Sequence, residues 1–118
     1  MIKMETESEP RNDLKLYNLS LKECPHEYYG QYINLYNYKD VRINAKSKNN
    51  AILIIEYSNY KSSVDMYFEH RLPADRWISV FVEPKLKYFR IHIKQIEDGG
   101  PCEVNYNGVS NTSSWWFY

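Results

Sequence analysis

The sequence predicts an all-β fold, an antiparallel β-sandwich or jelly roll, in a single domain within its 118 residues. Short stretches rich in β-branched, aliphatic and aromatic residues recur at intervals of roughly ten residues, and turn-forming residues separate them. No window of useful length shows the 3.6-residue apolar period of an amphipathic helix. Short strands at this spacing are typical of two antiparallel sheets packed face to face.

The stretch Ala51–Ser58 is the predicted centre of the fold. Turn formers precede it at Asn49 and follow it after Ser58, and nearly all of its residues are aliphatic, aromatic or β-branched. Leu53, Ile55 and Tyr57 share one face, while isoleucines occupy the other. Apolar residues on both faces predict a strand that is buried on both sides or covered by another segment.

The other predicted strands follow in chain order, each ended by a turn signal. The first, 14–21, has a mixed leucine spacing that fits either an irregular strand or one short helical turn. Further strands are expected at 28–38, 41–46, 64–72, 77–82 and 88–94. Asn107-Gly108 is a strong hairpin signal between 103–106 and Val109. In the 88–94 strand, Phe89, Ile91 and Ile93 are predicted to point inward.

Tyrosines are unusually dense in the first third of the chain. Within 28–38, alternation predicts a strand that buries Ile33 and Leu35 and presents tyrosines on its other face. Tyrosine combines a large contact area with a polar hydroxyl, which suits interfaces. The alternative is that these rings only cover one end or edge of the sandwich. The predicted partner-binding residues here are Tyr28, Tyr29, Tyr32, Tyr36 and Tyr38.

The two chain ends differ in composition from the predicted sandwich domain, 14–110. Residues 1–13 are acidic and polar and predict a flexible arm, which becomes ordered on a neighbouring subunit in the alternative view. Residues 111–118 form an aromatic tail, because four consecutive aromatic residues follow a Ser/Asn/Thr stretch. Such a tail either folds back as a last strand or, as we favour, docks into a partner. Its partner-binding residues are Trp115, Trp116, Phe117 and Tyr118.

Two cysteines, Cys24 and Cys102, lie near opposite ends of the predicted sandwich domain. Neither belongs to a Cys-x-x-Cys pair, which argues against zinc binding and thioredoxin-type chemistry. Two free thiols in a reducing compartment are the favoured interpretation. The alternative is a disulfide that ties the first strand region to the last and contributes about 4 kcal/mol in the chain-entropy description.

Composition and motifs exclude several functional classes. The formal net charge is zero, from 15 basic and 15 acidic residues, so no overall field attracts nucleic acid. No apolar run approaches the ~20 residues of a membrane span. The chain contains no Gly-x-Ser-x-Gly, no phosphate-binding Gly-x-x-x-x-Gly-Lys and no His-Glu-x-x-His. The sequence therefore predicts no enzyme, cofactor, metal site, nucleic-acid partner or membrane span.

Some ionisable groups are nevertheless expected to interact. Glu56 with Arg90 is predicted to form a structural cross-strand ion pair. His70 and His92 are each expected to bond a neighbouring group, and in the alternative they meet across strands. A calcium-binding rim is the alternative role for three loop-side carboxylates, Asp65, Glu69 and Asp75.

Five stretches, over about residues 31–95, resemble in order and spacing a β-sandwich module of virus and phage structural proteins. They are Tyr38-Lys39-Asp40-Val41-Arg42-Ile43, Leu53-Ile54-Ile55-Glu56-Tyr57-Ser58, Val64-Asp65, Pro73-Ala74 with Trp77, and Lys87-Tyr88-Phe89-Arg90-Ile91. The module occurs in phage tail, baseplate and fibre proteins and in virion proteins of large DNA viruses. It is similar in outline to the discoidin or galactose-binding-like jelly roll. Family members usually place Asp-Gly after the serine, where this chain has Asn59-Tyr60-Lys61.

The resemblance implies a non-enzymatic virion structural or assembly protein, such as a minor capsid, cement or fibre-associated subunit. Its partners would be other virion proteins, bound through the surface tyrosines and the chain ends. The start of the chain carries no hydrophobic signal-peptide region, so we expect synthesis in the host cytoplasm and localisation in the virion. The alternative is a carbohydrate-binding module for attachment to a glycan, with Tyr60 or Trp77 stacking on sugar.

Overall fold

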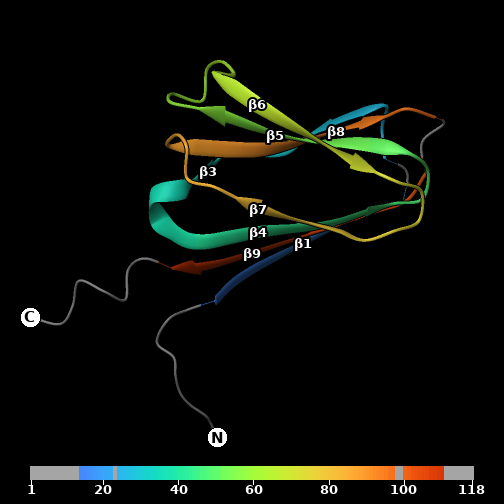
Figure 1. Cartoon of the computed structure of the whole chain (residues 1–118), viewed down its shortest axis with the longest axis horizontal. Coiled ribbons are helices and arrows are strands. Elements are labelled where there is room, and N and C mark those ends of the chain that lie inside the picture. Colours follow the sequence, from blue (N-terminus) through green and yellow to red (C-terminus); the bar gives the residue numbers. More distant parts are fainter. Residues whose placement is uncertain (1–13, 23, 98–99, 111–118) are drawn as a thin grey trace, which may run out of the picture.

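The computed structural model describes residues 14–22, 24–97 and 100–110, which form two antiparallel sheets packed face to face (Figure 1). One sheet has the strand order β1-β9-β4-β7, and the other has the order β2-β8-β5-β6, with β3 also paired to β8. The strands are β1 Leu14–Leu21, β2 Glu27–Tyr29, β3 Ile33–Asn34, β4 Tyr38–Ser47, β5 Ala51–Ser58, β6 Met66–Leu72, β7 Ile78–Val82, β8 Tyr88–Gln95 and β9 Cys102–Ser110. Within these residues, no helix is both long and apolar enough for a membrane crossing.

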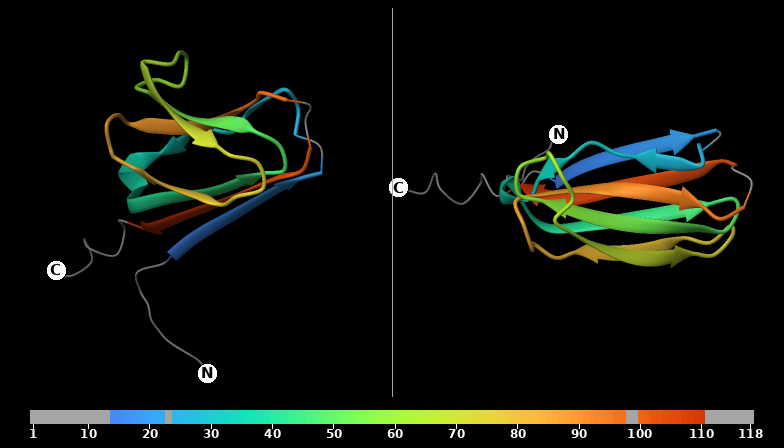
Figure 2. Two further views of the ribbon diagram at one scale, coloured as in Figure 1. Left: turned by 45° about the vertical axis from the view of Figure 1, so that its right-hand side comes forward. Right: turned by 90° about the horizontal axis from the view of Figure 1, so that it is seen from above.

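The connectivity is that of a jelly roll. If β2 and β3 are taken as one interrupted strand, eight strands remain, and the chain changes sheet at every connection except β5 to β6. Every strand pair is antiparallel. Figure 2 shows the two layers from the side and from above, with β5 and β8 together in one layer and β4 and β9 in the other. The predicted fold class is confirmed.

The central strand β5, Ala51–Ser58, has the predicted bounds and lies between β8 and β6. Its inward residues pair in register with the inward residues of β8: Leu53 faces Ile93 and Ile55 faces Ile91. All four side chains are at most 2% exposed. The facing sheet contributes Ile43, Ala45, Val80, Val82 and Val104 to the same core. Each large side chain buried in this way contributes roughly 1.5–3 kcal/mol to folding.

The predicted tyrosine strand over 28–38 is wrong. A 3₁₀ turn, η1, covers Leu35–Asn37 and separates the short strand β3 from β4. The side chain of Asn34 caps this turn, because its Oδ1 accepts the backbone N–H of Tyr36 at 2.9 Å. Alternation stops at the turn, so the tyrosines do not share one face.

The predicted hairpin at Asn107-Gly108 is also wrong, since β9 runs without interruption from Cys102 to Ser110. The strand is paired on both sides, with β1 through Asn107–Leu16 and with β4 through Asn107–Arg42. Tertiary pairing on both edges overrides the local turn preference. Gly108 instead allows the ring of Tyr38 to pack closely, because a Cβ there would lie 3.2 Å from that ring.

Two further segments differ in detail from the predicted strands. Residues 14–21 form the regular strand β1 rather than a helical turn. Lys39-Asp40, between the predicted strands 28–38 and 41–46, forms a bulge inside β4, where the register shifts between Lys39 and Arg42 and Asp40 has φ 57°. The predicted N-terminal arm (1–13) and aromatic tail (111–118) lie outside the described residues.

Candidate binding surface

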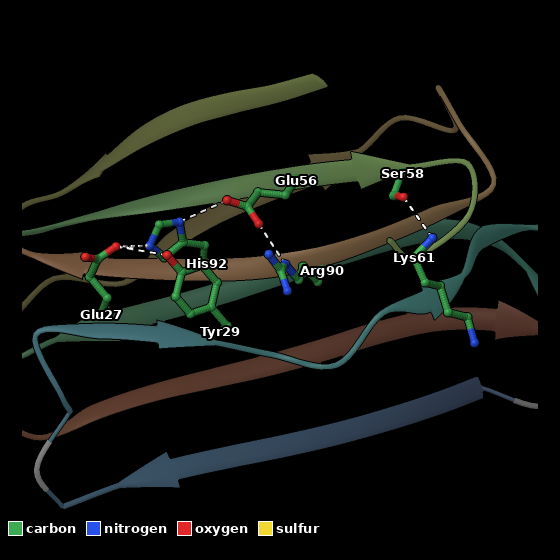
Figure 3. Close-up of polar contacts among 7 residues, drawn as sticks. All are labelled: Glu27, Tyr29, Glu56, Ser58, Lys61, Arg90 and His92. Atoms are coloured by element: carbon green, nitrogen blue, oxygen red, sulfur yellow. Dashed lines mark hydrogen bonds and ion pairs between the residues drawn. The ribbon is translucent and has the colours of Figure 1, made fainter. Parts of the chain in front are cut away.

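The outer face of the five-stranded sheet carries a cluster of polar and aromatic side chains. Strand alternation turns Arg90 and His92 of β8 away from the core, as predicted, and Glu56 of β5 lies opposite Arg90 in register. Glu27 and Tyr29 come from β2, which flanks β8 on the side opposite β5, and Tyr29 pairs with His92. We call Glu27, Tyr29, Tyr32, Glu56, Arg90 and His92 the outer-face cluster. Figure 3 shows most of its members together.

His92 is the centre of the outer-face cluster and is only 7% exposed. Its Nδ1 lies 3.0 Å from Glu56 Oε2, and its Nε2 lies 2.9 Å from Glu27 Oε1 (Figure 3). Both ring nitrogens of His92 thus lie within hydrogen-bond distance of a carboxylate oxygen. The ring then links two carboxylates from strands that are not neighbours in the sheet.

Arg90 is held by charge on one side and by aromatic rings on the other. Its Nε donates to Glu56 Oε1 at 2.7 Å, which confirms the predicted ion pair. Its Cζ lies 4.8 Å from the ring centre of Tyr29 and 4.7 Å from that of Tyr32. A planar guanidinium suits such stacking, and each contact adds cation–π attraction. The Tyr29 ring also stacks on His92, with ring centres 4.1 Å apart.

The hydrogen bonds of the cluster shift the pKa values of its exposed members. The pKa of Glu27 is lowered, first by the hydrogen bond from His92 and then by that from Tyr29. The pKa of Tyr29 is raised, chiefly because its hydroxyl donates to the Glu27 carboxylate at 3.0 Å. The contact thus favours the protonated phenol of Tyr29 and the ionised carboxylate of Glu27, the two forms that this hydrogen bond requires.

Glu27 is the member of the cluster that sequence reasoning missed. It lies 65 positions from His92 in the chain, and only the pairing of β2 with β8 brings the two together. A single glutamate next to two tyrosines carries no local sign of such a partner. The expected hydrogen bond between His92 and a neighbouring group is present. His92 pairs with Ile54, and His70 pairs with Leu53. These two neighbours in β5 point to opposite faces of the sheet, so the two histidines do not meet.

Ser58 and Asp65, which belong to the stretches that carry the resemblance, hold the loop that follows β5 by hydrogen bonds. Ser58 Oγ accepts the backbone N–H of Tyr60 at 3.2 Å. It also accepts the backbone N–H of Lys61 at 2.9 Å (Figure 3). Asp65 Oδ2 accepts the N–H of Asn59 at 2.8 Å. Lys61 takes the left-handed conformation, with φ 67°, and its Nζ lies 4.9 Å from the ring centre of Tyr88. Ser58 and Asp65 thus serve this loop as structural caps.

The predicted partner-binding tyrosines fall into two groups. Tyr29 and Tyr36 are 48% and 68% exposed, and Tyr32 stacks on Arg90. Tyr28 and Tyr38 instead pack against the core as partly buried side chains. The four tail residues, Trp115, Trp116, Phe117 and Tyr118, lie outside the described part of the chain.

The two predicted sugar-stacking residues lie at opposite ends of the sandwich. Tyr60 is in the loop between β5 and β6 and is 83% exposed, whereas Trp77 precedes β7 and is 47% exposed (Figure 1). Trp77 has Lys46 Nζ 6.0 Å from its ring centre. The two rings therefore belong to separate surfaces and cannot stack on one sugar together.

The carboxylates considered for calcium are likewise spread along β6. Asp65 precedes the strand, Glu69 lies within it, and Asp75 follows it at the other end, where its carboxylate is 3.6 Å from Lys46 Nζ. In the described residues, no group of three or more His, Cys, Asp or Glu side chains is arranged to hold a metal ion.

Cys24 and Cys102 are buried free thiols that lie side by side. The backbone brings them together, because the N–H of Cys24 donates to the carbonyl of Gly100 at 2.9 Å, two residues before Cys102. The hydrogen bond from Cys102 lowers the pKa of Cys24 to about 7, against the opposing effect of burial. The pKa of Cys102 is raised, first by that same bond and then by burial.

Comparison with known proteins identifies no family for this chain. No family model matches the chain, and no curated protein matches it. Among solved structures, the solution NMR structure of a de novo designed double-stranded β-helix is similar, with 15% sequence identity and a TM-score of 0.44. The likeness covers 80% of this chain and 97% of that chain. The fold assignment rests on the strand connectivity and not on this likeness.

Proposed function

We propose that this protein is a non-enzymatic structural and assembly protein that acts through protein–protein contacts made by its outer-face cluster. The observation that carries the proposal is the guanidinium of Arg90, which is bonded to Glu56 and lies within 4.8 Å of the ring centres of both Tyr29 and Tyr32. Tyrosine and arginine dominate the energetic centres of protein interfaces. Because these side chains are already fixed, they lose less conformational entropy when a partner binds them.

The chemistry of His92 favours binding over catalysis. A catalytic histidine needs one ring nitrogen directed at a nucleophile or a substrate. Here both nitrogens contact carboxylates, at 2.9 and 3.0 Å, and the Tyr29 ring covers the imidazole. The cluster therefore supports a rigid surface rather than a proton-transfer site.

The virion assignment remains a proposal that rests on the resemblance over residues 31–95. A minor capsid, cement or fibre-associated subunit works by rigid docking onto repeated neighbours, and a jelly roll with a preorganised Tyr/Arg surface suits that task. We infer localisation in the virion on the same ground.

Co-sedimentation with particles tests the proposal. A tagged full-length chain is expressed in cells that produce the particles of its source, and released particles are separated on a density gradient. We expect the chain to migrate with the particles and Tyr29→Ala to reduce this amount roughly tenfold or more, as for an interface hot spot. Tyr60→Ala is the matched control, because Tyr60 is more exposed but lies outside the cluster.

The contrary outcomes are equally clear. The proposal is wrong if the wild-type chain stays at the position of the free protein, or if Tyr29→Ala and Tyr60→Ala incorporate alike. Circular dichroism and urea unfolding of each variant show whether a loss of incorporation reflects a lost contact or a lost fold, since Tyr29 also supports His92.

A further inference from the structure

A concave site lies where the β2–β3 connection faces the other sheet. It has a volume of about 380 Å³, within the roughly 300–1,000 Å³ range of small-molecule sites. The β2–β3 connection, the β3–η1 segment and β9 each supply part of the wall. Its lining residues are Tyr28, Gly30, Gln31, Tyr32, Ile33, Asn34, Asn37, Tyr38 and Tyr106.

The lining has a consistent chemistry. Four tyrosines supply ring faces and hydroxyl groups, and Gln31, Asn34 and Asn37 supply side-chain amides. None of the lining residues is Asp, Glu, Lys, Arg or His. The lining therefore offers no opposite charge to balance that of a charged ligand. The pocket therefore suits a neutral molecule that has both polar groups and an apolar face.

The close approach of Gly30 and Tyr106 shapes this pocket. The N–H of Gly30 donates to the carbonyl of Ile91 at 2.9 Å, and a Cβ at Gly30 would lie 3.2 Å from the Tyr106 hydroxyl oxygen. Burial, and next the nearby Tyr28 hydroxyl, raises the pKa of Tyr106. The Tyr106 hydroxyl thus stays a neutral phenol, able to donate as well as accept hydrogen bonds over the physiological pH range.

Two other lining side chains are held in place by bonds outside the pocket. Asn34 Oδ1 accepts the N–H of Tyr36 at 2.9 Å. The ring of Tyr32 has the Arg90 guanidinium 4.7 Å from its centre. Such support preorganises a site and lowers the entropy lost on binding.

We propose that this pocket binds a neutral saccharide, with one pyranose ring seated among the tyrosines. A sugar ring presents an apolar C–H face that packs on an aromatic ring, while its hydroxyls both donate and accept hydrogen bonds, as amides and phenols do. The proposal moves the sugar site from Tyr60 and Trp77, which lie at opposite ends of the sandwich, to a pocket built between the two sheets.

Titration by NMR tests the proposal on the full chain. The probes are the methyl glycosides of galactose, glucose, mannose and N-acetylglucosamine, followed by amide shifts of the ¹⁵N-labelled protein. We expect at least one glycoside to bind with a Kd on the order of 1 mM, because a single ring buries little area. The shifted amides should lie at 30–34, 37–38 and 106.

Variants separate this pocket from the loops. Tyr106→Phe keeps the ring and removes the hydroxyl, and we expect about tenfold weaker binding for one lost hydrogen bond. Asn37→Ala should also weaken binding. Because Asn37 is exposed, this variant tests the pocket even if Tyr106→Phe impairs folding. Tyr60→Ala and Trp77→Ala are the matched controls and should bind as the wild type does.

The proposal is overturned if no glycoside shifts the pocket amides at hundreds of millimolar, or if the loop variants lose binding while Tyr106→Phe and Asn37→Ala keep it. Shifts caused instead by acetate or inorganic phosphate would also contradict it, since the lining offers no charge. Tyr29 does not line the pocket, so failure here leaves the proposed protein-contact surface intact.

Discussion

Glu56 on β5 and Arg90 on β8 lie opposite each other in register, and Arg90 Nε is 2.7 Å from Glu56 Oε1. The Glu56 side chain is 10% exposed and that of Arg90 is 24% exposed, so water screens the pair only in part. The second oxygen of Glu56 contacts His92 at 3.0 Å. One carboxylate therefore contacts two side chains of the neighbouring strand, the guanidinium of Arg90 and the imidazole of His92.

Replacing Glu56 with glutamine should destabilise the protein strongly. Glu56→Gln preserves the shape but leaves the charge of Arg90 without its partner and breaks the His92 contact. Loss of one partner of a buried pair costs roughly 3–5 kcal/mol, and partial exposure reduces this to about 2–3 kcal/mol. Urea unfolding measures the change. Glu69→Gln, at an exposed position of the neighbouring strand β6, should change stability by less than about 0.5 kcal/mol.

The Glu27–His92 contact predicts a specific loss of stability in acid. The pKa of Glu27 is lowered from its ordinary 4.5 by folding. Its contribution is therefore fully present above pH 4.5 and is lost as the pH falls through the lower folded pKa. Urea midpoints of the wild type and Glu27→Gln should differ by a constant amount above pH 4.5 and converge as the pH falls further. A difference that stays constant below pH 4.5 would show that the carboxylate charge plays no part.

The neighbouring thiols Cys24 and Cys102 should form a disulfide when an oxidant is supplied. A pKa of about 7 gives Cys24 a large thiolate fraction at neutral pH. With oxidised glutathione, the Cys24 thiolate attacks the glutathione disulfide, and the Cys102 thiol then displaces glutathione, which leaves one protein disulfide and two reduced glutathione molecules. Mass spectrometry should show the loss of two hydrogens.

The new bond would close a loop of roughly eighty residues and add about 4 kcal/mol of stability in the chain-entropy description. Cys102→Ser provides the control, because its product with glutathione should stop at the mixed disulfide. If the wild type also stops at the mixed disulfide, the two sulfurs are not positioned to bond.

Alanine at Gly30 should destabilise the fold and distort the tyrosine-lined pocket. The added Cβ would lie 3.0 Å from Ile91 Cγ1, and Ile91 is fully buried. Relief of this contact requires a shift of either the core or the β2–β3 connection, at about 1–3 kcal/mol. Thermal unfolding checks the change against Gln31→Ala, an exposed neighbour expected to be nearly neutral. Equal stability of both variants would show that the connection moves freely.

Much of the fold could be predicted because strand alternation is local. The bounds of Ala51–Ser58, the inward set Phe89, Ile91 and Ile93, and the opposition of Glu56 and Arg90 all follow from short-range patterns. The errors lie where two preferences compete. At Asn34 a side-chain cap ends the strand that alternation predicted. Near Gly108 pairing on both edges prevents the turn that Asn-Gly favours.

The sequence by itself determined the class of fold, because a period of two and frequent turn residues allow little else. It also determined that Arg90 and His92 of β8 lie on the face of the sheet that points away from the core. Only the tertiary structure decided that Glu27 meets His92, that Cys24 lies beside Cys102, and that Tyr106 faces the β2–β3 connection. These contacts join residues far apart in the chain, and strand order and register, which no single segment encodes, bring them together.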